Sequence, residues 1–281
     1  MGYPDRIIPD GSIHHVMNRG VARQPIFFTD KHRIEFGRLL AEIHERFGIE
    51  VLAYCLMGNH YHLIVRCPAG RLSEAMQHLG STFVRHVNDE VGRDGPLFRS
   101  RFKSILVDSD RYLLRAVRYV HRNALDLAGV TSPAGYRWSS HRAYLGHRRS
   151  PEFLDTSVVL EMFGNDVARF DRFVCDSEIR HPSADRPDLA DLRHTIELAA
   201  MVADDADDTS SASIVRSASM LLTEMLTGAE RQQWIDELGV PNREALRKAM
   251  GRARQRMASM VMLADVMEFV ANEFGLARPA A

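Results

Sequence analysis

The chain is poor in cysteine and contains no long hydrophobic run. Its three cysteines stand at positions 55, 67 and 175 of 281. Their spacing matches no metal-binding motif, and three thiols cannot all pair with one another. A disulfide-stapled secreted scaffold is therefore disfavoured, and a reducing compartment is expected. No apolar run approaches the roughly 18 residues of a membrane span, so we expect a cytoplasmic protein with no membrane partner.

Lysine is almost absent as well. Only Lys31, Lys103 and Lys248 are lysines, and the other 33 of the 36 basic side chains are arginines. Arginine binds phosphate with a planar fork, although a GC-rich coding sequence would produce the same excess. The charge is also divided, because residues 1–150 hold 22 basic and 14 acidic side chains, whereas residues 151–281 hold 14 and 23. A basic front half suggests that this half meets a polyanion.

The most informative pattern is a pair of histidines one residue apart. His60 and His62 stand at the start of a segment rich in β-forming residues. Side chains alternate across a strand, so both imidazoles project from one face and Tyr61 points the other way. Two imidazoles on a rigid strand make half of a metal site. The alternative is a pair of ordinary surface histidines, because a chain with 13 histidines contains such pairs by chance.

The hydrophobic pattern of the first 123 residues predicts four strands and three helices. The strands are expected at residues 14–18, 49–57, 61–67 and 102–107, and the helices at about 30–47, 73–91 and 109–123. Gly48 ends the first helix, Ser73 can cap the second, and Asp108 or Ser109 begins the third. The order β-α-β-β-α-β followed by a helix is the ferredoxin-like split βαβ arrangement, an α+β fold with a small antiparallel sheet.

Beyond residue 150 the pattern is helical, without clear strands. We expect an N-terminal domain over residues 1–150, a helical extension over 151–203, an acidic linker over 204–213 and a helical C-terminal domain over 214–281. Within the last domain, an arginine-bearing helix from Arg243 to Arg256 follows a turn, which is the outline of a helix-turn-helix. The acidic balance of this region favours the alternative, a plain accessory or dimerisation domain.

The predicted helix at 109–123 carries polar residues at helical spacing. Tyr112, Arg115, Tyr119 and Asn123 are three or four residues apart and share one face. A phenol beside a metal-bound phosphate is a plausible nucleophile, and an amide oxygen four residues later can complete a metal shell. The alternative is structural: Tyr119 packs on the edge of the sheet, and Asn123 caps the helix.

Several stretches, taken in order, resemble one protein family. They are His15-Val16-Met17-Asn18-Arg19-Gly20, Arg23-Gln24-Pro25-Ile26-Phe27, Leu52-Ala53-Tyr54 leading into Met57-Gly58-Asn59-His60-Tyr61-His62, Gly95-Pro96-Leu97-Phe98, Arg101-Phe102-Lys103-Ser104, Arg118-Tyr119-Val120-His121-Arg122-Asn123 and Tyr136-Arg137-Trp138-Ser139-Ser140. Residues 1–150 thereby resemble the IS200-type single-tyrosine HUH transposases, and in particular the REP-associated tyrosine transposases. The resemblance implies that His60 and His62 bind a divalent metal, that Asn123 is the third ligand, and that Tyr119 is the nucleophile.

Three positions depart from the family pattern. Gly58 stands where the family usually has proline, and Ala124 replaces a common proline after Asn123. Both changes loosen the backbone, one at a turn and the other at a helix end. Tyr61 is unusually large for its position and carries its own hydroxyl, but strand alternation points it away from the histidines. None of these changes removes a functional group.

The resemblance implies metal-dependent cleavage and strand transfer of single-stranded DNA at hairpin-forming repeats, through a 5′-phosphotyrosine intermediate. No nucleotide cofactor is needed, and the chain has no P-loop glycine pattern. Imidazoles favour zinc-like ions by affinity, whereas the resemblance implies Mg²⁺ or Mn²⁺. Candidate DNA contacts, each alternatively a solvated cation, are Arg19, Arg23, Arg99, Arg101, Lys103 and Arg115.

Two other functions compete with this hypothesis. One is a domesticated, sequence-specific DNA-binding protein that keeps the fold without cleaving DNA. The other is a zinc-dependent hydrolase built on the histidine pair, which lacks an acidic ligand or general base nearby. A homodimer is also expected as an alternative to a monomer, since the tyrosine helix of such enzymes can serve its own chain or a second copy.

Overall fold

The computed structural model describes residues 8–176, 192–193, 196–197, 211–226, 228–240, 242–259 and 267. The chain divides into two compact units, Met1–Ser177 and Glu178–Ala281. Residues 204–210 of the predicted acidic linker lie outside the described residues. Most of the predicted extension beyond residue 176 lies outside them as well. No helix in the described ranges combines the length and hydropathy that a membrane crossing requires.

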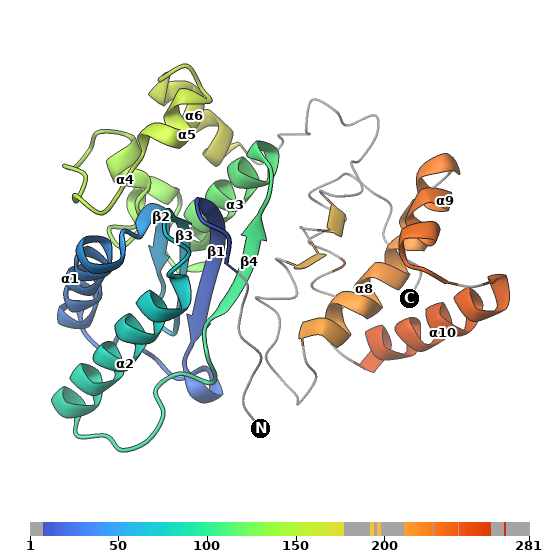
Figure 1. Ribbon diagram of the computed structural model, residues 1–281, viewed down its shortest axis with the longest axis horizontal. Coiled ribbons are helices and arrows are strands. Elements are labelled where there is room, and N and C mark those ends of the chain that lie inside the picture. Colours follow the sequence, from blue (N-terminus) through green and yellow to red (C-terminus); the bar gives the residue numbers. More distant parts are fainter. Residues whose placement is uncertain are drawn as a thin grey trace. The chain divides into compact units, whose positions relative to one another are not determined.

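The first unit is built on a four-stranded antiparallel sheet of order β2-β3-β1-β4 (Figure 1). The strands are β1 (Ser12–Arg19), β2 (Glu50–Leu56), β3 (His60–Cys67) and β4 (Lys103–Val107). β3 pairs antiparallel with both β1 and β2, so it lies between two strands that run in the same direction. This is the predicted split βαβ arrangement, and the α+β fold is confirmed.

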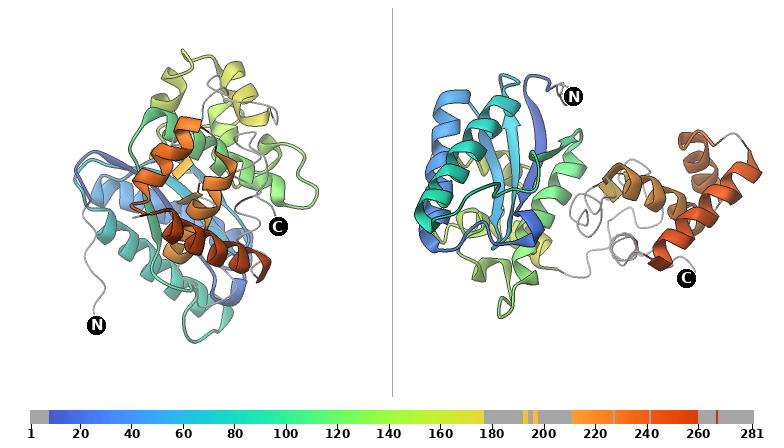
Figure 2. Two further views of the ribbon diagram at one scale, coloured as in Figure 1. Left: turned by 90° about the vertical axis from the view of Figure 1, so that its right-hand side faces the viewer. Right: turned by 90° about the horizontal axis from the view of Figure 1, so that it is seen from below.

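The sheet buries both of its faces under helices (Figures 1 and 2). One face is covered by α1 (Asp30–Phe47) and α2 (Leu72–Val91), and the other by α3 (Asp110–Arg122) and the helices that follow it. Alternation along β3 sends Tyr61 into the α1–α2 side, while Ile64 packs on the α3 side. The shorter helices of this unit are α4 (His141–Tyr144), α5 (Ser157–Glu161) and α6 (Val167–Cys175).

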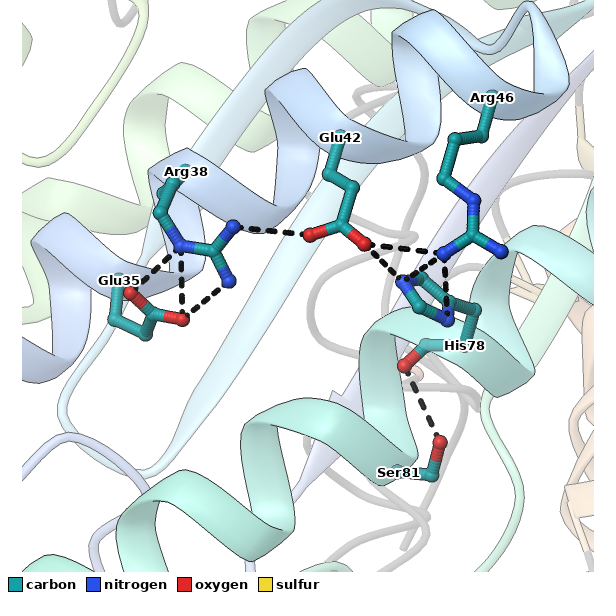
Figure 3. A network of polar contacts seen from close by, with 6 residues as sticks. All are labelled: Glu35, Arg38, Glu42, Arg46, His78 and Ser81. Carbon is teal, nitrogen blue, oxygen red and sulfur yellow. Dashed lines mark hydrogen bonds and ion pairs between the residues drawn. The ribbon is translucent and has the colours of Figure 1, made fainter.

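A polar network joins the outer surfaces of α1 and α2 (Figure 3). Glu42 of α1 accepts hydrogen bonds from Arg38, at 3.0 Å, and Arg46, at 3.1 Å. Across the helix pair, His78 of α2 lies 2.6 Å from the same carboxylate. These contacts, with that of His78 first, hold the pKa of Glu42 below its usual value. Partly exposed ion pairs add little stability, so the network adds a polar contact between α1 and α2 to the apolar core that these helices share.

The second unit contains three described helices. They are α8 (Ser211–Met225), α9 (Gly228–Glu237) and α10 (Arg243–Ser259). Trp234 of α9 is buried, and its indole N–H donates a 2.9 Å hydrogen bond to the main-chain oxygen of Ser219 in α8. Asn242 caps α10, because its side-chain oxygen accepts a 2.8 Å hydrogen bond from the amide of Ala245. Trp234 therefore fastens α9 to α8, and Asn242 fixes the start of α10 after the turn.

Two glycines beside the β2–β3 turn give opposite expectations for the same substitution. A Cβ on Gly20 would lie 2.0 Å from the main-chain oxygen of Gln24, whereas a Cβ on Gly58 would meet nothing within 4 Å. Gly20→Ala must therefore displace the backbone of the turn that follows β1. We expect it to lower the free energy of unfolding by about 1–3 kcal/mol, and Gly58→Ala to change it by less than about 0.5 kcal/mol, in urea unfolding. Equal losses in the two variants would contradict this account.

Candidate metal centre and tyrosine site

β3 places the two predicted metal-binding histidines side by side. The rings of His60 and His62 have centroids 5.1 Å apart and are nearly perpendicular, at 88°. Tyr61 points to the other face of the sheet, where its ring packs 4.8 Å from that of Phe36. The alternation predicted from the sequence is confirmed, so Tyr61 does not approach the histidine pair.

α3 crosses the face of the sheet from which the histidines project. The ring of Tyr119 lies edge-on to His62, with centroids 5.4 Å apart. One turn later, the side chain of Asn123 makes hydrogen bonds to His60 and to the Tyr119 phenol, and its Nδ2 donates to the Tyr119 main-chain oxygen at 2.9 Å. The four-residue spacing on α3 thus brings a phenol and an amide to the imidazole pair.

Asn59, to which the sequence analysis assigned no role of its own, orients the first histidine. Its side-chain oxygen lies 2.7 Å from Nδ1 of His60, and its Nδ2 donates to the main-chain oxygen of Arg23 at 3.2 Å. The hydrogen bond with Asn59 assigns the proton to Nδ1 of His60 and leaves Nε2 with a lone pair. That nitrogen is therefore in the form that coordinates a metal.

His15 is a member of the site that sequence reasoning did not select. Its Nε2 lies 3.0 Å from Nδ1 of His62, and its ring centroid is 5.9 Å from that of Tyr119. His15 and His62 lie on neighbouring strands, with His62 opposite Met17 in the β1–β3 register. The only sequence signal would have been the pairing of β1 with β3, because residues two apart on a strand share a face. We call His15, His60, His62, Tyr119 and Asn123 the histidine–tyrosine cluster.

The cluster offers a donor set that fits a divalent metal. Nε2 of His62 is buried and has no hydrogen-bond partner. An unpartnered buried nitrogen is costly, and metal coordination removes that cost. His15 can accept a hydrogen bond from Nδ1 of His62, which is how a second residue usually fixes the tautomer of a metal ligand. Two imidazole nitrogens and the Asn123 amide oxygen are thus available together.

The imidazoles of the cluster are neutral at neutral pH. Burial lowers the pKa of His15 to about 3 and, with help from the charge of Arg19, lowers the pKa of His60 to about 4. The pKa of His62 is well below its usual value, mainly through burial and then through His60, His15 and Arg19. Neutral imidazole is the form that binds a metal, so protons do not compete for these nitrogens near pH 7.

The phenol of Tyr119 is protonated at neutral pH. Burial raises its pKa above the usual value of about 10, and the hydrogen bond from Asn123 opposes that rise. Any reaction in which this oxygen attacks an electrophile must therefore remove a proton and stabilise the resulting anion. A cation close to the phenol can stabilise that anion.

The six predicted DNA-contacting cations fall into two groups. Arg19 ends β1 directly opposite His60 in the strand register, and Lys103 begins β4 opposite Met17. Arg115 lies one turn before Tyr119 on α3. The exposed loop cations are Arg23, Arg99 and Arg101.

The loop cations are attached to the site through the backbone. The amide of Arg99 donates to the main-chain oxygen of Arg19 at 3.0 Å, and the main-chain oxygen of Arg23 accepts from Asn59. Arg101 stands two residues before β4. A basic rim therefore lies along the loops next to the end of β3 where His60 stands, and the charge of Arg19 acts on His60 and His62.

The chain is similar to known proteins over part of its length. Residues 10–123 match the sequence profile of the family described as "Transposase IS200 like", a range that contains the whole histidine–tyrosine cluster. A solved structure described as "Structure of the REP associates tyrosine transposase bound to a REP hairpin" is 15% identical, covers 56% of this chain and 94% of its own, and gives a TM-score of 0.44. No curated protein matches the sequence. Over residues 10–123, this chain is therefore similar to the IS200-like transposase family.

Proposed function

We propose that this protein cleaves single-stranded DNA at hairpin-forming repeats and joins the strands again, with Tyr119 as the nucleophile. The observation that carries the proposal is the position of the Tyr119 ring, 5.4 Å from His62 on the face shared with His60. A phenol, two neutral imidazoles and an amide oxygen in one buried cluster suit phosphoryl transfer. The family match over residues 10–123 supports the same reaction class.

In the proposed reaction, the Tyr119 oxygen attacks the scissile phosphorus. The bond from phosphorus to the 3′ oxygen of the upstream strand breaks, which leaves a free 3′-hydroxyl and a 5′-phosphotyrosyl link. A second 3′-hydroxyl then attacks the same phosphorus, and the tyrosine oxygen leaves and regains its proton. Each step exchanges one phosphodiester for another, so no nucleotide cofactor is consumed.

His60, His62 and Asn123 would hold the divalent metal, Mg²⁺ or Mn²⁺. A bound ion of this kind polarises the scissile phosphate and offsets the charge on its oxygens. The chain's own contribution is orientation: Asn59 fixes the tautomer of His60, and His15 fixes that of His62. Arg115, one turn from the nucleophile, would stabilise the phenolate, and Arg19 would bind the phosphate beside His60.

The remaining parts of the chain would support DNA binding in the cytoplasm. The catalytic domain is proposed over residues 1–150, followed by the extension, the acidic linker and the C-terminal domain at the boundaries predicted above. Arg23, Arg99, Arg101 and Lys103 would contact phosphates along the DNA strand.

The capped turn between α9 and α10 supports a helix-turn-helix, with Arg247 and Arg252 exposed on its second helix. A homodimer would let α3 serve either its own sheet or that of the second copy.

Incubation with labelled single-stranded hairpins from the flanks of its own gene, with Mn²⁺, tests the proposal. A denaturing gel should show a labelled species of reduced mobility that protease removes. The competing function, a domesticated DNA-binding protein, predicts hairpin binding that survives EDTA and no nicking with any metal. Nicking without a covalent species would instead favour metal-dependent hydrolysis on the histidine pair.

Asn59→Ala should weaken metal binding without unfolding the protein. The substitution removes the hydrogen bond that orients His60 but leaves all three proposed ligands in place. Loss of such an orienting group typically lowers metal affinity about 10–100-fold. Mn²⁺ titration calorimetry measures the change. Asn88→Ala is the matched control, because it also removes an asparagine hydrogen bond, a 2.9 Å bond to the main-chain oxygen of Gly95, and Asn88 lies on α2, which covers the other face of the sheet. Equal affinities in the two variants would refute the role of Asn59.

A further inference from the structure

A second cluster of metal-binding side chains lies in the first unit, apart from the histidine–tyrosine cluster. It consists of His141 on α4 with Asp171 and Cys175 on α6, and the potential ligand atoms of all three lie within 4.8 Å of one another. Oδ1 of Asp171 is 3.0 Å from Nε2 of His141 and 3.3 Å from the Cys175 sulfur. We propose that these three residues form a zinc site, which we call the α4–α6 site.

The chemistry of the three donors selects the metal. A thiolate, an imidazole and a carboxylate together are soft and borderline ligands that favour Zn²⁺ over Mg²⁺ or Ca²⁺. Bonds of about 2.0–2.3 Å in a tetrahedral shell separate neighbouring donors by roughly 3.3–3.8 Å, close to the two separations observed here. His141 is fully buried, Asp171 is partly exposed and Cys175 is exposed, so an ion can enter from solvent and a water can fill the fourth position.

A chain of hydrogen bonds behind His141 is arranged as metal ligands require. Nδ1 of His141 lies 3.3 Å from Nδ1 of His121, and Nε2 of His121 lies 2.8 Å from Oγ of Ser140. That hydroxyl in turn contacts the main-chain nitrogen of Tyr54, at 2.9 Å, and its oxygen, at 3.3 Å. All these side chains are buried, which fixes the direction of the His141 ring.

This series of hydrogen bonds satisfies each of its polar side-chain groups when Nε2 of His141 binds the ion. Nδ1–H of His141 then donates to His121, Nε2–H of His121 donates to Ser140, and the Ser140 hydroxyl donates to the Tyr54 carbonyl. Without metal, the same chain can run in reverse, with Nε2–H of His141 donating to Asp171. Each histidine keeps one proton in both arrangements, so the only proton released on zinc binding is that of the Cys175 thiol.

The proposed site would fasten α6 to α4 and, through the hydrogen bond between His141 and His121, to α3, which carries Tyr119. Arg118 of α3 donates to the main-chain oxygen of Phe173 at 2.9 Å, and Arg122 donates to that of Val174 at 3.0 Å. These bonds already hold the last turn of α6, where cations near carbonyl groups are favourable. An ion on His141, Asp171 and Cys175 would add a second attachment of α6, through its side chains.

Cobalt substitution tests the α4–α6 site, because a Co²⁺–thiolate bond gives a charge-transfer absorption in the near ultraviolet that imidazole and amide ligands do not. The full-length protein, reduced with a phosphine, is titrated with Co²⁺ alone. We expect the band to rise to saturation as Co²⁺ is added and to disappear in Cys175→Ser. The change is at an exposed side chain, and circular dichroism checks that the variant is folded. Zinc bound per chain should also fall by one.

A double variant, His60→Ala with His62→Ala, separates this site from the histidine–tyrosine cluster. It should keep the full charge-transfer band, because none of its altered residues supplies sulfur. Asp171→Asn should retain the band but weaken Co²⁺ binding by about tenfold or more, since a neutral amide replaces an anionic ligand. Absence of the band in the wild-type protein, or its persistence in Cys175→Ser, would overturn the proposal.

Discussion

Replacing Tyr119 with phenylalanine is expected to abolish the covalent protein–DNA species and to slow strand cleavage by a factor on the order of 10⁴ or more. The substitution removes the only atom that the proposed mechanism places in a bond to phosphorus. The phenyl ring keeps the packing against His62 and His15, so the fold and the metal ligands should be unaffected. A denaturing gel with end-labelled hairpin DNA measures the loss.

Tyr61→Phe is the matched control for this prediction. It also removes one phenolic hydroxyl, from a residue that stands between the two histidines in the sequence but points to the other face, against Phe36. We expect it to form the adduct at close to the wild-type rate. Hairpin binding should be within about threefold of the wild type in both variants, since cations supply most of that affinity. A full-strength adduct in Tyr119→Phe would reject the proposed nucleophile.

The histidine pair and the tyrosine helix were predictable because each depends on local periodicity. A period of two on β3 puts His60 and His62 on one face, and a period of 3.6 on α3 lines up Tyr119 with Asn123. The strand order follows from the short β2–β3 turn and the handed crossovers through α1 and α2. In these cases the nearest neighbours along the chain determine which side chains meet.

The contributions of His15 and Asn59 could not be read from local patterns. His15 reaches His62 only because β1 pairs with β3 in one register, and Asn59 is held by the backbone of a loop 36 residues earlier. The prediction that Ser73 caps α2 was wrong for a similar reason: the helix begins at Leu72 with Arg71 as its N-cap, because Leu72 is fully buried in the core. Ser109, in contrast, caps α3 as predicted.

Buried histidines should also make the protein unfold sharply in mild acid. Five of them are buried with lowered pKa values, mainly because of desolvation: His15, His32, His62, His121 and His141. Since the unfolded chain takes up protons near pH 6.5 and the folded chain does so only at lower pH, the free energy of unfolding falls as the pH drops. For each of these histidines, the free energy of unfolding falls by about 1.4 kcal/mol for every pH unit of acidification between the pKa of the unfolded state and that of the folded state.

Over about one to two pH units, the combined cost of several such groups becomes comparable with the usual 5–15 kcal/mol of stability, so unfolding is expected between about pH 6 and 4.5. Urea unfolding in EDTA at a series of pH values measures the slope. His121→Gln should reduce that slope by about 1.4 kcal/mol per pH unit, whatever its effect at neutral pH. A stability that stays level from pH 7 to 4.5 would mean that these imidazoles are hydrated, and the neutral, metal-ready state assigned to the histidine–tyrosine cluster would lose its physical basis.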